Sequence, residues 1–109
     1  MITQVSGIEF QELVLSSKLL SLVKFRAEWS GACHIISPLY NELSADYYGV
    51  VNFFTVDVEM DGELDKEYGV LEIPTILFFK NGKVIDHIKG LTSKNVLAKK
   101  IEQALTEAS

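Results

Sequence analysis

The sequence has very few of the residues that make covalent cross-links. It contains one cysteine and two prolines among 109 residues. Because a disulfide needs two thiols, the chain cannot form one internally, which fits a reducing compartment. No apolar run approaches the roughly 20 residues of a membrane span, and the N-terminus lacks the basic start and apolar core of a secretory signal. We therefore expect a cytoplasmic protein that makes no membrane contact.

Basic residues and metal-ligand patterns are also scarce. Ten Lys and Arg residues stand against 15 Asp and Glu residues, for a formal net charge of -5. The charges are scattered, so no basic stripe is available for a nucleic-acid backbone. Neither His34 nor His87 has a second histidine or cysteine at ligand spacing. We expect no nucleic-acid partner, no metal and no cofactor.

One acidic run stands out against this background. Acidic residues occupy alternate positions over 57–65: Asp57, Glu59, Asp61, Glu63 and Asp65. The run lacks the glycine and the terminal glutamate of a calcium loop. Carboxylates favour the positive end of a helix dipole, so we interpret the run as the solvated start of a helix.

What the sequence does contain is the pattern of one small α/β domain covering residues 1–109. Its length and its 48% hydrophobic content suit a single core. Strands that alternate with helices indicate a mixed sheet with helices on both faces. The expected elements are a helix over 6–17, a strand over 19–26, a helix bent by Pro38 over 31–48, a strand over 50–58, a short helix over 61–68, strands over 75–80 and 84–89 joined at Asn81-Gly82, and a last helix capped by Thr92 or Ser93.

Several motifs occur in an order and spacing that resemble those of the thioredoxin family. They are AEWSGAC at 27–33, Pro38, YGVLEIPT at 68–75, FFKNGK at 78–83, and Gly90. Together they cover nearly the whole chain. The resemblance implies a thioredoxin-like fold, with a central mixed sheet of four to five strands.

The family's two active-site thiols correspond to Ser30 and Cys33. In thioredoxins the first cysteine of C-x-x-C attacks a disulfide and the second resolves the mixed disulfide. Serine is not ionised near neutral pH and forms no disulfide, so a dithiol cycle is chemically excluded for this chain. We expect Ser30 instead to cap the helix, accepting from the backbone N–H of Ala32 or Cys33.

Lys24 occupies the position where the family usually has a buried aspartate. Two interpretations are open. In the one we favour, its methylenes lie along the core edge and its ammonium reaches water or an acid such as Glu28 or Asp57. In the other, Lys24 lies beneath Cys33, where its positive charge stabilises the thiolate.

The resemblance also implies a substrate-side loop at Ile73-Pro74. In the family this peptide bond is cis, and the adjacent backbone pairs with an extended peptide. An isolated Ile-Pro bond would instead be an ordinary trans turn, and the tryptophan of the motif could simply cover the core. The residues expected to contact a bound peptide are Trp29, Gly31, Ala32, Ile73, Pro74, Thr75 and Gly90.

These residues support more than one function. We expect single-thiol exchange at Cys33 with a protein or peptide client, which would then carry a thiol or disulfide. The alternative is a non-catalytic module that binds a client beside Pro74, with Cys33 as a small buried hydrophobe. A third interpretation is an assembly role in which another subunit fills the groove.

Overall fold

The sheet combines parallel and antiparallel strands around a central β2. The computed structural model describes residues 2–60 and 62–107, and the strand order over these ranges is β1-β3-β2-β4-β5. The parallel strands β1, β3 and β2 occupy one side, whereas β4 and β5 run antiparallel on the other. This confirms the expected α/β fold class. The bounds are β1 Ile2–Gln4, β2 Leu20–Arg26, β3 Val51–Asp57, β4 Thr75–Lys80 and β5 Lys83–Lys89.

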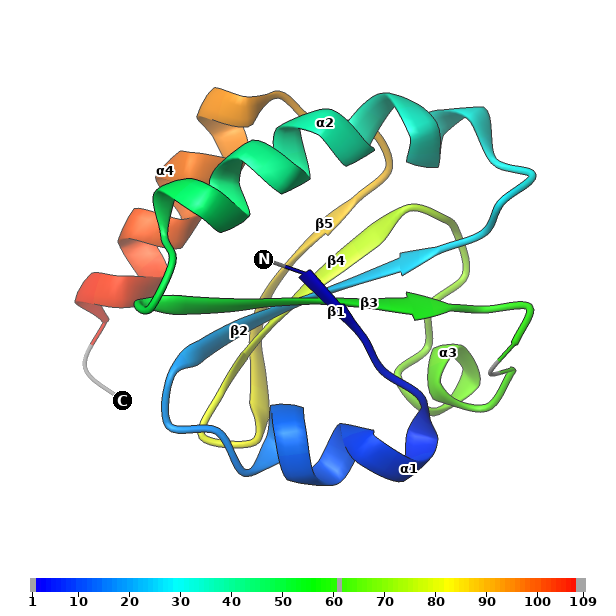
Figure 1. Cartoon of the computed structure of the whole chain (residues 1–109), viewed down its shortest axis with the longest axis horizontal. Coiled ribbons are helices and arrows are strands. Elements are labelled where there is room, and N and C mark those ends of the chain that lie inside the picture. Colours follow the sequence, from blue (N-terminus) through cyan, green and yellow to red (C-terminus); the bar gives the residue numbers. More distant parts are fainter. Residues whose placement is uncertain (1, 61, 108–109) are drawn as a thin grey trace.

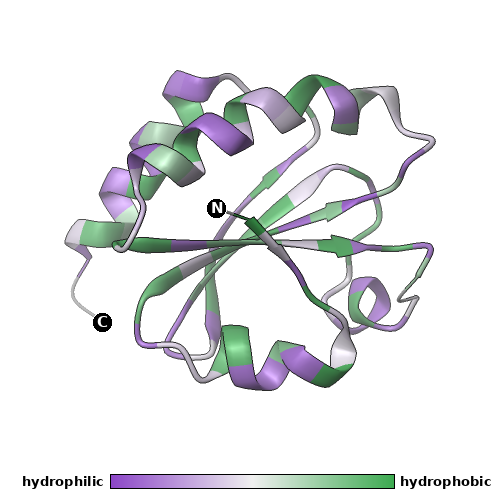
Figure 2. Ribbon diagram, viewed as in Figure 1, coloured by the Kyte–Doolittle hydropathy of each residue, from purple (hydrophilic) through white to green (hydrophobic). Residues whose placement is uncertain are grey.

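Helices cover both faces of this sheet (Figure 1). On one face lie α2 (Gly31–Asp46) and α4 (Lys94–Thr106), and on the other lie α1 (Gly7–Phe10) and α3 (Leu64–Glu67). Hydrophobic and hydrophilic segments alternate along the helices, as an amphipathic covering layer requires (Figure 2). None of the helices within 2–60 and 62–107 is long and apolar enough to cross a membrane.

Each face of the sheet has its own hydrophobic core. One core packs Tyr40 and Ile101 against strand residues such as Phe78, and the opposite core packs Phe10 against Phe79. Both cores draw residues from β2, β3 and β4, because successive side chains of a strand point to opposite faces.

The structure departs from the sequence-based elements in three places. The short strand β1 was not expected. The expected helix over 6–17 begins as α1 but continues as a π-helix, η1 (Gln11–Leu15). The helix expected over 61–68 spans only Leu64–Glu67, and Asp61 lies outside the described residues.

Turn and cap chemistry follows the sequence closely. Asn81 and Gly82 have φ angles of 52° and 78°, the left-handed conformation that a tight two-residue hairpin requires at both positions. Ser93 caps α4, its Oγ accepting from the Val96 N–H at 3.1 Å. β2 lies between β3, its parallel neighbour, and β4, its antiparallel neighbour. Residues 27–30 connect the end of β2 to the N-terminus of α2.

Candidate functional site

Ser30 forms the N-cap of α2, as expected. Its Oγ accepts from the Cys33 N–H at 3.2 Å, and its carbonyl accepts from the His34 N–H at 3.3 Å. Its extended backbone, with φ of -88° and ψ of 115°, is the usual N-cap conformation. Only 6% of the residue is exposed. Ser30 therefore holds the helix start in place of a nucleophile.

Cys33 lies on the inner side of α2, facing the sheet. Its exposed fraction is 1%, compared with 69% for Trp29 in the preceding loop. Gly31 is exposed and Ala32 is half-buried, so these two residues form the outer surface of the first helical turn. The site thus exposes an indole and backbone at its surface and keeps its thiol inside.

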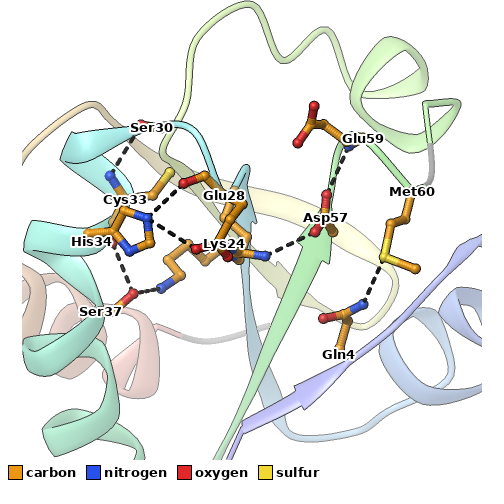
Figure 3. Close-up of polar contacts among 11 residues, drawn as sticks. Gln4, Lys24, Glu28, Ser30, Cys33, His34, Ser37, Asp57, Glu59 and Met60 are labelled. Carbon is orange, nitrogen blue, oxygen red and sulfur yellow. Dashed lines mark hydrogen bonds and ion pairs between the residues drawn. The ribbon is translucent and has the colours of Figure 1, made fainter.

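Lys24 is buried beneath this helix turn, and its expected pairing with Glu28 or Asp57 is wrong. It is 3% exposed, and its Nζ donates to Ser37 Oγ at 3.1 Å (Figure 3). Both acids are engaged by Arg26, whose guanidinium lies 2.8 Å from Glu28 Oε1 and 3.0 Å from Asp57 Oδ2. Arginine spans both carboxylates, so Lys24 turns toward α2 instead.

The surroundings of Lys24 disfavour its charge. Burial lowers its pKa from 10.5 to about 8; negative charge on Cys33 opposes this shift, and Arg26 adds to it. The ammonium also lies 4.8 Å from the centre of the Tyr40 ring, within cation–π range. Lys24 thus lies near Cys33, as in the second interpretation, and its effect on the thiol stays a prediction.

Ser37 and Tyr40 were not identified from the sequence as neighbours of this site. Ser37 Oγ donates to the Cys33 carbonyl at 2.9 Å, in addition to accepting from Lys24. The Tyr40 hydroxyl donates toward the Phe54 carbonyl at 2.8 Å, and burial raises its pKa well above 10. The signal was present: residues 33, 37 and 40 follow one another at helical spacings of four and three, which places them on one face.

The loop opposite α2 carries the expected peptide-binding residues. The Ile73-Pro74 peptide bond is cis. Pro74 and Thr75 are buried; the Pro74 carbonyl accepts from the Gly90 N–H at 2.7 Å, and Thr75 Oγ1 donates to the Glu72 carbonyl at 2.6 Å. Ile73 is half-buried, and no described residue bonds to its N–H or C=O. Its main chain is therefore free to pair with another segment.

His34 takes no part in a catalytic pair with Cys33. It is exposed on α2, where its Nε2 lies 2.7 Å from the Glu28 carbonyl and 3.5 Å from a carboxylate oxygen of Glu28. Over residues 2–60 and 62–107, no three His, Cys, Asp or Glu residues are grouped so as to hold a metal ion.

The fold and this site together define an α/β protein with one buried thiol in the first turn of α2, and with a motif loop and a cis-proline loop that line one depression. A model of the thioredoxin family matches residues 1–103. The chain is 36% identical over 102 residues to a thioredoxin from Synechocystis sp., covering 94% of this chain and 95% of the relative. It is 36% identical over 105 residues to a thioredoxin from Rickettsia felis, and this match covers 96% of this chain and 100% of the relative. The chain therefore belongs to the thioredoxin family, with one cysteine where a dithiol site needs two.

Proposed function

We propose that this protein binds an extended segment of a partner protein beside Trp29 and Ile73, without covalent chemistry at Cys33. The observation that carries this proposal is the contrast in exposure at the helix start. Trp29 is 69% exposed and Cys33 is 1% exposed. A client that approaches this surface meets the indole first, whereas the thiol lies behind the first turn of α2.

The free main chain of Ile73 supports the same proposal. An extended peptide can use this N–H and C=O for strand-like pairing, which supplies affinity, while side-chain contacts supply specificity. Pro74 cannot contribute in this way, because its carbonyl is taken by Gly90. Exposed tryptophans are frequent anchors of protein interfaces. We therefore assign the main contacts with the client to Trp29 and Ile73. Gly31 and Ala32 provide the adjoining surface of α2.

Single-thiol exchange at Cys33 is the second candidate, and Lys24 is the observation in its favour. In that reaction the Cys33 thiolate attacks one sulfur of a client disulfide, and the S–S bond breaks to release the other sulfur as a thiolate. A further thiol then displaces Cys33 from the mixed disulfide. The buried ammonium of Lys24 would stabilise the attacking thiolate. The first turn of α2 would have to open to admit the client.

The proposal keeps two expectations from the sequence, a single domain over residues 1–109 and a cytoplasmic location. Support for the single domain comes from the two cores, which share β2, β3 and β4. The relatives are thioredoxins, a family that acts on protein substrates, and this supports a protein client.

Trp29→Ala is expected to weaken client binding about tenfold or more, as loss of an interface tryptophan commonly does. Cys33→Ala is expected to change the dissociation constant less than about twofold, because a buried thiol makes no client contact. The probes are three blocked, fluorescein-labelled nonapeptides of alternating valine and serine, with arginine, citrulline or glutamate at the centre. Binding is measured by fluorescence anisotropy.

Ile8→Ala is the matched control, because Ile8 is an 88% exposed apolar residue on α1, away from the site. It should bind like the wild type. Loss of binding with Cys33→Ala but not with Trp29→Ala would contradict the binding proposal, because it would place the client contact at Cys33 and not at Trp29. Failure of all three peptides to bind the wild type would contradict the proposed groove.

A further inference from the structure

A depression of about 300 Å³ adjoins the surface proposed to bind the client. Its apolar walls come from three segments, which are the motif loop, the residue after β3 and the segment before the cis-proline: Trp29, Val58, Val70, Leu71 and Ile73. Leu71 is 98% exposed, so the rim of the depression is apolar as well. A segment paired with Ile73 would place a side chain within reach of this depression, because Ile73 is part of its wall.

The charged groups of the depression are all of one sign. Asp65 and Glu72 line it, and none of the described lining residues is basic. Arg26, the cation nearest along the chain to Trp29, already pairs with Glu28 and Asp57. The depression thus combines apolar walls with two carboxylates, and none of its described lining residues carries a positive charge.

Asp65 and Glu72 both have acceptor capacity that the described chain leaves unused. Asp65 Oδ1 is buried and receives no hydrogen bond, so at this one residue the acidic run is less solvated than expected, whereas Glu59 and Glu63 are exposed. A buried acceptor without a donor is costly, and because Asp65 also lines the depression, its negative charge favours a cation placed there. Glu72 is exposed and forms no ion pair with any described residue. Its carboxylate lies over Gly90, where a Cβ would sit 3.4 Å from Oε2.

We propose that this depression selects clients with a basic side chain, arginine or lysine, within an extended apolar segment. The proposal rests on the proposed client binding and adds the chemistry of the client. The methylenes of such a side chain would pack against Val70 and Ile73, as long cationic side chains do on apolar surfaces. Its charged end would meet Asp65 and Glu72, and an arginine would also stack on the Trp29 ring.

The three nonapeptides test this proposal, because arginine and citrulline have nearly the same shape and differ in charge. We expect the arginine peptide to bind the wild type about tenfold more tightly than the citrulline peptide, and the glutamate peptide to bind most weakly. The preference should shrink as salt is raised, because exposed charge pairs are screened. Trp29 is the only tryptophan of the chain, and its fluorescence gives a second, label-free readout.

Asp65→Asn and Glu72→Gln should each reduce the ratio between the arginine and citrulline peptides to about threefold or less, and the citrulline peptide should bind about as before. Glu12→Gln is the matched control, because it removes one negative charge from an exposed residue of η1. It should leave the ratio between the arginine and citrulline peptides unchanged. Circular dichroism checks that each variant is folded. If Asp65→Asn does not fold, Glu72→Gln, on the exposed loop, decides the question.

The outcomes separate this inference from the proposed function beneath it. Equal binding of all three peptides by the wild type would overturn the charge selection and leave the binding surface in place. An unchanged ratio in Glu72→Gln and Asp65→Asn would also overturn it, by placing the selective charge elsewhere. If no peptide binds, the proposed function fails first, and the inference fails with it.

Discussion

Ser30→Cys is expected to give this protein the dithiol–disulfide exchange activity that a chain with one cysteine cannot have. The introduced thiol stands at the N-cap of α2, where the helix dipole favours a thiolate, and Cys33 follows three residues later as a resolving thiol. We expect catalysed reduction of an aromatic disulfide, with dithiothreitol as reductant, to rise about a hundredfold over the wild type. Mass spectrometry should find an intramolecular disulfide in the oxidised variant.

Ser93→Cys is the matched control for this gain of activity. Ser93 caps α4 as Ser30 caps α2, but the residue three positions later is Val96. This variant should form mixed disulfides without turnover, because it has no resolving thiol at the required spacing. If Ser30→Cys forms no internal disulfide and gives no turnover, then the missing thiol is not what disables the site.

Lys24→Met is expected to raise the free energy of unfolding at pH 7 by about 1–2 kcal/mol, after the contacts that methionine loses are subtracted from the cost of the buried charge. The reason is the lowered pKa of Lys24, about 8 instead of 10.5, which makes its buried ammonium costly in the folded state. Methionine keeps the length of the side chain without its charge. The contacts that it loses are the hydrogen bond to Ser37 and the contact with the Tyr40 ring. Urea denaturation measures the difference.

The same substitution should change how stability depends on pH. Below about pH 8 Lys24 is protonated in both folded and unfolded chains, so its full cost is present. Between about 8 and 10.5 the folded protein loses this proton before the unfolded chain does, and wild-type stability therefore rises with pH. The advantage of Lys24→Met should shrink over the same window.

Lys18→Met is the control, because Lys18 is exposed and its substitution should change stability by less than about 0.5 kcal/mol. If Lys24→Met destabilises the protein at pH 7, the contacts of Lys24 with Ser37 and Tyr40 outweigh the cost of burying its charge. A stability gain would instead mean that the lysine is kept at a cost to the fold.

The parts of the fold that local chemistry dictates could be predicted from the sequence. Asn81-Gly82 specified the hairpin, because few other residue pairs accept two left-handed backbone conformations. Ser30 was predicted as one cap, and Thr92 or Ser93 as another, from their positions before apolar helical patterns; Ser30 and Ser93 are the caps observed. The helix over 31–48 was predicted from its periodicity and observed as Gly31–Asp46.

The parts that depend on long-range partners could not be predicted. The strand β1 has three residues, too few for an alternating pattern to show. Lys24 was assigned to the wrong partners, because nothing local indicates that Arg26 takes both carboxylates. The depression joins residues from three separate segments, around Trp29, Val58 and Leu71. Only the folded chain brings Asp65 and Glu72 together on its wall.

The central claim is that Cys33 is shielded and that the exposed surface beside it binds clients. The most direct measurement is the rate of Cys33 alkylation by iodoacetamide in the native protein, from about pH 6 to about 9, followed by mass and compared with the urea-unfolded chain. The account predicts native rates about a hundredfold or more below the unfolded rates throughout this range, because 1% of the residue is exposed. Native rates equal to or above the unfolded rates would contradict it and make Cys33 a reactive thiolate.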